Sequence, residues 1–369
     1  MKKRKQFFLT IVIVSVMIGF LAGVVGELWV NSFLLPDPYL NFKNYHDLTR
    51  KIDDLIAGEK QDKDLTEQDA FYREVIGKAQ PAIVSIYADK EFKQSGFDTF
   101  EKSDFLGQGI IITNDGWILT HSTVANNLAA DYWVRLNDKK LYQTEKVINE
   151  QRTGIVFLKI QAQNLPVAEF ALKNDLTAGQ NVFVFSNSKI KSNNLSQLNY
   201  APKSSIKDYI HSSQEFYKFV LLEQEVDSEF IGSPVINLEG KTIGFLAQEN
   251  GLIIPVDHVL PLLRSLGGDE YVWPYLGINF YDLSEVLNPN FENKKGAQIL
   301  STAGIEKTSP AFGILQAGDI IKKVEQEEIN ENKNLPELIS QYQVGDKVRF
   351  TIMRDSEQKE VEITLVGLE

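Results

Sequence analysis

The sequence contains no cysteine among its 369 residues, and this excludes disulfides, thiolate catalysis and cysteine-based zinc or iron–sulfur sites. Histidine is also scarce. The four histidines (His46, His121, His211 and His258) stand singly and do not have the short spacing of metal ligands. The sequence therefore predicts neither a metal nor a cofactor.

Positive charge is in short supply. Lysine and arginine total 38 against 50 aspartates and glutamates, which gives a net charge of −12. Such an acidic chain is a poor ligand for a phosphate backbone, so nucleic acid is not an expected partner. Apolar residues make up 43% of the chain, enough for hydrophobic cores, and its length favours two domains.

Long apolar runs are absent except at the N-terminus. Lys2, Lys3, Arg4 and Lys5 precede an uncharged run that continues to Gly26. A run of about 20 apolar residues can span a bilayer as a helix, whereas a cleaved signal peptide has a shorter apolar region. We therefore expect a membrane anchor through residues 7–26, with a cleaved signal as the alternative. The basic tip is expected in the cytoplasm, which makes residues 1–30 tip plus anchor and leaves the rest of the chain outside the cytoplasm in a single-pass protein.

Changes in pattern divide the remaining chain. Residues 31–69 are predicted to be a stalk, and a helix with Phe71, Val75 and Ala79 on one apolar face follows it. Between residues 82 and 255, many short apolar runs are separated by turn signals, which is typical of antiparallel barrels or sandwiches. The strands predicted from these runs are 82–87, 109–113, 117–120, 133–136, 154–160, 181–185, 219–222, 234–237, 242–247 and 252–255. A short helix over 256–265 and a linker over 267–273 precede a final unit, 274–369, that mixes strands with two helices, around 310–316 and over 335–342.

Three stretches of the middle region, taken in order, resemble the HtrA/Deg family of trypsin-like serine proteases with PDZ domains. Residues 107–124, GQGIIITNDGWILTHSTV, are similar to the family's G-S-G-x-I-I-x-x-x-G-x-I-L-T-N-x-H-V. Residues 152–159, RTGIVFLK, are similar to R-T-D-L-A-V-L-K, and residues 230–240, FIGSPVINLEG, to G-N-S-G-G-P-L-x-N-x-x-G. The resemblance implies a mainly β fold, with a two-barrel trypsin-like domain over 70–266 and an α+β PDZ domain over 274–369.

The resemblance fails at the three positions that would carry the chemistry. In register, Thr123 stands where the family has its general-base histidine, Gly154 where it has the orienting aspartate, and Ile231 where it has the nucleophilic serine. A threonine hydroxyl is not a base near neutral pH, glycine has no carboxylate, and isoleucine has no nucleophilic atom. Glu229 also replaces the first glycine of the oxyanion loop. We therefore expect a pseudoprotease with no catalytic residues.

Neighbouring polar residues leave one alternative open. His121 and Ser122 lie beside Thr123, and Ser228 and Ser233 flank Ile231. A rewired serine site built from them would need two shifts of register and would still lack an acid. The alternative function is therefore an active HtrA-type serine endopeptidase that uses such a rewired site.

The C-terminal unit keeps the PDZ pattern. The loop Tyr275, Leu276, Gly277 and Ile278 resembles a carboxylate-binding loop with its edge strand, and residues 309–321 resemble the family's S-P-A-x-x-A-G-L-x-x-G-D-x-I. A PDZ domain binds a peptide C-terminus by adding it to the exposed strand edge. The peptide-binding residues are predicted to be the loop together with Leu335, Leu338 and Ile339 of the following helix. The alternative is that these apolar residues form the core of the domain.

Together these expectations describe a membrane-anchored binding protein. It would bind polypeptides or protein C-termini as a scaffold, a chaperone or a regulator in protein quality control. The family resemblance also implies a homo-trimer or a mixed oligomer with an active relative.

Overall fold

The structure is a computed structural model that describes residues 2–29, 67–92, 99–129, 131–186, 189–264, 271–286 and 295–367. The chain divides into two compact units, Met1–Glu67 and Gln68–Glu369. The described part of the first unit is helix α1 (Lys2–Trp29). Within it, Thr10–Glu27 has a mean hydropathy of 2.1 and is long and apolar enough to cross a membrane. The predicted stalk lies almost wholly outside the described residues.

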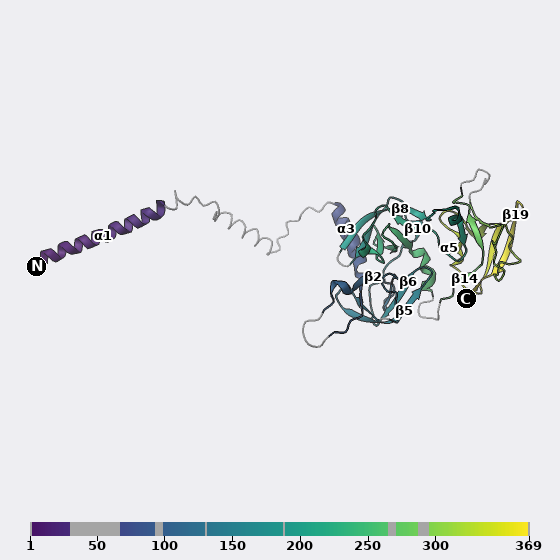
Figure 1. The fold of residues 1–369 in the computed structure, drawn as a ribbon, viewed down its shortest axis with the longest axis horizontal. Helices are drawn as coiled ribbons and strands as arrows, with labels where there is room; N and C mark the ends of the chain where they lie inside the picture. Colours follow the sequence, from purple (N-terminus) through teal and green to yellow (C-terminus); the bar gives the residue numbers. More distant parts are fainter. Residues whose placement is uncertain are drawn as a thin grey trace. The chain divides into compact units, whose positions relative to one another are not determined.

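The second unit begins with helix α3 (Glu67–Ala79) and a first closed barrel (Figure 1). The barrel strands are β1 (Ile83–Ala88), β2 (Phe105–Ile111), β3 (Trp117–His121), β4 (Tyr132–Arg135), β5 (Leu141–Glu150) and β6 (Ile155–Ile160). They close in the order β1-β2-β3-β6-β5-β4. Five of the six follow predicted strands. The pattern missed β5 because this strand is mostly exposed and carries few apolar residues.

A second closed barrel follows. Its strands are β7 (Asn181–Ser186), β8 (Lys189–Tyr200), β10 (Phe219–Leu222), β11 (Pro234–Asn237), β12 (Thr242–Leu246) and β13 (Leu252–Pro255). They close in the order β10-β13-β12-β11-β7-β8. One core joins the two barrels, since Leu119 and Phe157 of the first pack in the same cluster as Phe183 and Phe245 of the second. The apolar face of α3, including Val75, packs into this cluster, as its helical spacing predicts. The expected closing helix is short: a 3₁₀ turn (Val256–His258) and α4 (Leu260–Leu263).

The C-terminal region forms a main sheet and a small two-stranded sheet made of its first and last strands. The elements of this region are β14 (Pro274–Tyr275), β15 (Asn279–Asp282), β16 (Ala297–Ile299), β17 (Ile320–Val324), β18 (Glu327–Glu328), helix α5 (Leu335–Ile339), β19 (Lys347–Arg354), β20 (Glu357–Thr364) and β21 (Val366–Gly367). The helix expected around 310–316 was wrong, because the chain there makes turns. Gly313 in that stretch has φ +81°, a left-handed conformation that interrupts a helix.

The main C-terminal sheet receives a strand from the second barrel's own sequence. Its order is β20-β19-β17-β16-β15-β9, and β9 (Ile210–Ser212) lies in the connection between β8 and β10. The two regions that the sequence divides at a linker over 267–273 are therefore joined by backbone pairing as well. The domain boundaries at 69/70, 266/267 and 273/274 stay predictions.

Candidate functional site

Backbone pairing in the first barrel brings two of the three predicted triad positions together. His121 ends β3 and pairs with Ile155 at the start of β6. One residue later, the backbone N–H of Ser122 donates to the carbonyl of Gly154 at 2.8 Å. Thr123 and Gly154 therefore lie on adjacent turns at one end of this barrel.

The loop that carries Ile231 reaches the same place from the second barrel. A Cβ built on Gly232, the residue after Ile231, would lie 3.2 Å from Thr123 Oγ1 and 3.7 Å from His121 Cβ. The three predicted positions therefore lie close together, where the loop of the second barrel meets the first.

The ring of His121 fills the space beside Gly154. A Cβ built on Gly154 would lie 3.0 Å from His121 Nε2 and 3.4 Å from Ser122 Oγ. Nδ1 of His121 lies 2.9 Å from Thr123 Oγ1 and also receives the backbone N–H of Thr123 at 3.3 Å. Because a backbone N–H can only donate, Nδ1 is an acceptor here and the ring proton of the neutral form is on Nε2.

Burial makes His121 a weak base. The residue is 8% exposed, and this burial lowers the pKa of His121 to about 4. A general base works best when its pKa lies near the operating pH, and this ring is far below neutrality. The hydroxyl that His121 contacts is the one on Thr123, whereas the rewired alternative needs Ser228 or Ser233.

The turn before β6 has no free acid to orient a histidine. Gly154 has φ +70°, a conformation that residues with a side chain rarely adopt. Glu150, the acid of this turn, caps it: its carboxylate accepts from the N–H groups of Arg152 at 3.1 Å and Thr153 at 2.8 Å. The same carboxylate also accepts from the indole of Trp273 at 3.0 Å.

Backbone N–H groups of the loop around Ile231 donate to carbonyls of the same loop. A 3₁₀ turn (Ser228–Phe230) lets the N–H of Ile231 donate to the carbonyl of Ser228 at 3.1 Å, and the N–H of Ser233 donates to Phe230 at 3.0 Å. An oxyanion hole needs such N–H groups free and aimed at the developing charge. Glu229 pairs with Lys189 at 2.5 Å instead of entering the site. The two candidate serines differ: Ser228 is exposed, whereas Ser233 is fully buried.

The predicted peptide-binding residues lie together, and their side chains are buried. Five of them belong to one hydrophobic cluster and are at most 2% exposed: Leu276, Ile278, Leu335, Leu338 and Ile339. Tyr275 is 7% exposed. Gly277 has φ +74°, and a Cβ there would lie 2.1 Å from that of Ser309, so only glycine fits this turn. Their burial does not test the prediction that they bind a peptide, because the side chains that line a PDZ groove can also belong to the core of the domain.

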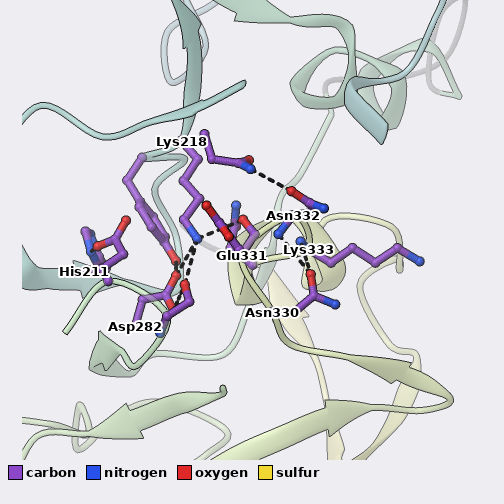
Figure 2. A network of polar contacts seen from close by, with 12 residues as sticks. His211, Lys218, Asp282, Asn330, Glu331, Asn332 and Lys333 are labelled. Atoms are coloured by element: carbon purple, nitrogen blue, oxygen red, sulfur yellow. Dashed lines mark hydrogen bonds and ion pairs between the residues drawn. The ribbon is translucent and has the colours of Figure 1, made fainter. Parts of the chain in front are cut away.

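A cluster of buried charges was missed at the sequence level. Lys218 is 1% exposed, and its Nζ lies 2.7 Å from the Oδ2 atom of Asp282, which is equally buried. Figure 2 shows the lysine side chain reaching Asp282 and the loop at Glu331, with His211 nearby. The available signal was a lysine set among aromatic and apolar residues in EFYKFVLL, because a lysine that is buried with such neighbours needs an acidic partner.

Family comparisons match both regions of the chain. A sequence model of the trypsin-like peptidase domain matches residues 107–245, and one of the PDZ domain matches residues 274–365. A Pseudomonas fluorescens protein named "probable periplasmic serine endoprotease DegP-like" is 26% identical over 329 residues, covering 86% of this chain and 66% of the relative. A Halomonas elongata protein of the same name is 27% identical, covering 72% of this chain and 57% of the relative. The chain thus spans less than two thirds of these relatives' length.

Solved structures show the same fold. The HtrA-type protease AlgW with a tripeptide superposes with a TM-score of 0.58 at 16% identity, covering 81% of this chain and 97% of that chain. A serine endoprotease from Yersinia pestis gives a TM-score of 0.50 at 18% identity, with 81% and 98% coverage.

Proposed function

The chain belongs to the HtrA family of trypsin-like proteases with a PDZ domain, and from this premise we propose that it has lost peptide-bond hydrolysis and works by binding polypeptides. One observation carries the proposal. The triad positions assemble in space, and Thr123, Gly154 and Ile231 stand at them without a base, an acid or a nucleophile. Loss of the serine or the histidine of such a triad reduces turnover by a factor on the order of 10⁶.

The surrounding backbone supports the same conclusion. The N–H of Ile231 is used inside its own 3₁₀ turn, so the loop does not present it to a developing oxyanion. Gly154 has left-handed backbone, so a side chain there would be strained. These changes affect the scaffold of the site as well as its side chains.

Polypeptide binding is the activity that remains for the fold. The PDZ region retains its glycine loop at Gly277, and the description of AlgW, a structure of the same fold, names a bound tripeptide. Strand addition needs only a backbone edge and pockets, and it does not depend on the triad. We infer a role as scaffold, chaperone or regulator in protein quality control, as a homo-trimer or in mixed oligomers with an active relative.

We place the protein outside the cytoplasm, held by α1. The relatives are named periplasmic, and Thr10–Glu27 has the length and hydropathy of a membrane span. If α1 is an uncleaved anchor, the protein stays in the membrane pellet after an alkaline carbonate wash and its mass includes residues 1–29. A mass that begins beyond residue 26, in the soluble fraction, would show a cleaved signal instead.

Casein degradation tests the loss of catalysis. We expect the purified chain in detergent micelles to release no fragments above a buffer blank, and the double variant Ser228→Ala, Ser233→Ala to behave in the same way. Cleavage that this double variant abolishes would establish the rewired serine site and overturn the proposal.

A second candidate function rests on the contact between His121 and Thr123. Its 2.9 Å distance is that of a base and a hydroxyl nucleophile, so an active endopeptidase would use Thr123. The matched control Thr123→Val keeps the size of the side chain and removes the hydroxyl. Casein cleavage that is lost in Thr123→Val but kept in the double serine variant would establish this function, whereas equal background in all forms would exclude it.

A further inference from the structure

Strand β9 lies on the edge of the C-terminal sheet where a PDZ ligand adds. Its residues pair antiparallel with β15: Ile210 faces Tyr281, His211 faces Phe280 and Ser212 faces Asn279. The other side of β15 is taken by β16, so β9 occupies its free edge. This is the geometry by which an extended peptide joins a PDZ sheet.

Ser213 stands at the carboxylate-binding loop in the place of a ligand's last residue. Its backbone N–H donates to the carbonyl of Ile278 at 2.9 Å, and its Oγ accepts from the N–H of Ile278 at 3.1 Å. In a PDZ complex, loop N–H groups of this kind receive the terminal carboxylate. The hydroxyl oxygen of Ser213 therefore takes up a donor that a peptide C-terminus would need.

Residues 217 and 218 fasten the segment to the far end of β15. Lys218 Nζ lies 2.7 Å from Asp282 Oδ2, 3.2 Å from Ser284 Oγ and 3.0 Å from the carbonyl of Glu331, a group visible in Figure 2. The hydroxyl of Tyr217 donates to the same carboxylate at 2.8 Å. Burial alone would raise the pKa of Asp282, but the charge and hydrogen bond of Lys218 lower it below its usual value, so this carboxyl is ionised.

His211 adds a further tie. Its ring stacks on Tyr217 with a centroid separation of 3.7 Å, and its Nε2 lies 2.8 Å from Glu285 Oε2. Glu285 follows β15 and also pairs with Lys203 at 2.7 Å. The segment thus makes backbone, ring and charge contacts along the whole of β15.

The helix on the other side of the predicted groove is tied to the second barrel as well. Glu337 of α5 pairs with Lys173 at 2.6 Å, and its carboxylate lies 3.3 Å from His258 Nε2. Both partners come from the trypsin-like region. The strand and the helix of the predicted groove are therefore each bound to the trypsin-like region.

We propose that the segment Ile210–Lys218 is an internal ligand of the PDZ groove, and that a polypeptide binds this groove only after displacing it. The inference rests on the proposed peptide-binding function and adds its regulation. A tethered ligand acts at an effective concentration of the order of millimolar for short linkers, so it competes strongly with free peptide. Apparent affinity falls in proportion to the fraction of molecules with an open groove.

A disulfide can lock the segment in place, because the chain has no cysteine of its own. Asn279 sends its N–H to Gly304 and accepts from Leu300, both away from β9, so Asn279 and Ser212 form a non-hydrogen-bonded pair. The Cα atoms of such a pair lie about 4.5 Å apart, within disulfide reach. The locking variant is Ser212→Cys with Asn279→Cys. Its control is Arg349→Cys with Glu362→Cys, an exposed pair between β19 and β20 at the other end of the sheet.

A proline opens the groove. Ile278 directs both its carbonyl and its N–H at Ser213. Two residues further along β15, Phe280 therefore faces His211 in the same way, as a hydrogen-bonded pair, and His211→Pro removes the N–H that this pair needs. Neither barrel uses β9, so both barrels keep their pairing. The matched proline control is Ile206→Pro. Ile206 is 84% exposed and is the first residue of a 3₁₀ turn, where proline is tolerated.

Two probes are measured on the full-length chain in detergent micelles: a phage-displayed library of random C-terminal peptides, and a fluorescent peptide of sequence IKDYIHSSQEFYK, residues 206–218. We expect His211→Pro to bind both at least tenfold more tightly than the wild type or Ile206→Pro. The oxidised locking variant is expected to bind at least tenfold more weakly than its reduced form, whereas oxidation of the control pair changes nothing.

Each result decides something. Equal library binding by oxidised and reduced locking variants would overturn the internal ligand and leave peptide binding intact. Binding of the 206–218 peptide but of no library member to His211→Pro would support the internal ligand and refute the proposed function. If that variant binds neither probe, both fail.

Discussion

We expect His121 to make the protein less stable as the pH falls. One substitution at this position should remove that pH dependence. In His121→Asn the amide oxygen can keep the acceptor near Thr123, and asparagine is the residue that the family motif carries at this position. The variant does not titrate. The two proteins therefore differ in the protonation of one buried ring, and other ionisable groups cancel in the comparison.

The magnitude follows from the displaced pKa. Burial lowers the pKa of His121 from 6.5 to about 4, and each tenfold change in proton affinity is worth about 1.4 kcal/mol. Between these pH values the unfolded chain binds a proton that the folded chain does not, so the free energy of unfolding decreases as the pH falls. The loss begins near pH 6.5, reaches about 3 kcal/mol near pH 4 and then levels off.

Urea unfolding of both proteins at pH 7, 5.5 and 4 measures this difference, and proton NMR of the ring signals measures the pKa directly. Only four histidines contribute signals, and the one missing from His121→Asn is identified by subtraction. A pKa near 6.5, with a wild-type-minus-variant difference that is constant across the pH range, would refute the reasoning. It would also make His121 a competent base and strengthen the rewired alternative.

Three further predictions concern backbone and buried charge. Gly154→Ala, at φ +70°, should cost about 1–3 kcal/mol in urea unfolding; Gly179→Ala, at φ +84° with open space around it, reports the backbone part alone, and equal costs would contradict a steric contribution. Lys218→Met should lower the free energy of unfolding by about 3–5 kcal/mol, because it leaves the charge of Asp282 buried without a partner. Adding Asp282→Leu should recover most of the lost free energy, and no recovery would refute this explanation. Because its pairing with Lys173 and His258 lowers the pKa of Glu337 to about 2, against burial, the wild type should lose stability between about pH 4.5 and 2, and Glu337→Gln should lose less in the same scan.

Much of the fold was readable from the sequence. Buried strands such as β3 and β12 carry continuous apolar runs, and turn residues bound them, so their positions were predicted to within a residue or two. The exposed strands β5 and β8 carry no such run, and they form because neighbouring strands of a closed barrel need partners. The expected helix near residues 310–316 failed for a related reason. Ala311 and Leu315 pack in the domain core while Phe312 and Ile314 are exposed, and the left-handed Gly313 lies in the turns between them.

The sequence predicted which residues stand at the candidate site, but not the orientation and hydrogen bonding of these residues. Motif register alone placed Thr123, Gly154 and Ile231, and the structure brings these positions together. The motif register could not show that the ring of His121 lies in the space beside Gly154. Nor could it show that backbone N–H groups of the Ile231 loop donate to carbonyls of the same loop. The first depends on the neighbouring turn before β6, and the second on the conformation that the loop itself adopts.

By itself the sequence determined the classes of chemistry that this protein lacks. The absence of cysteine excludes thiolate chemistry, and the motif register predicts no base, acid or nucleophile at the three triad positions. Only the tertiary structure decided whether the PDZ edge is open. The strand that covers it, Ile210–Ser212, is too short and too polar for its pattern to mark it. Its partner lies about 70 residues away in sequence, and pairing over that distance is fixed by the packing of the whole domain and by buried pairs such as Lys218 and Asp282.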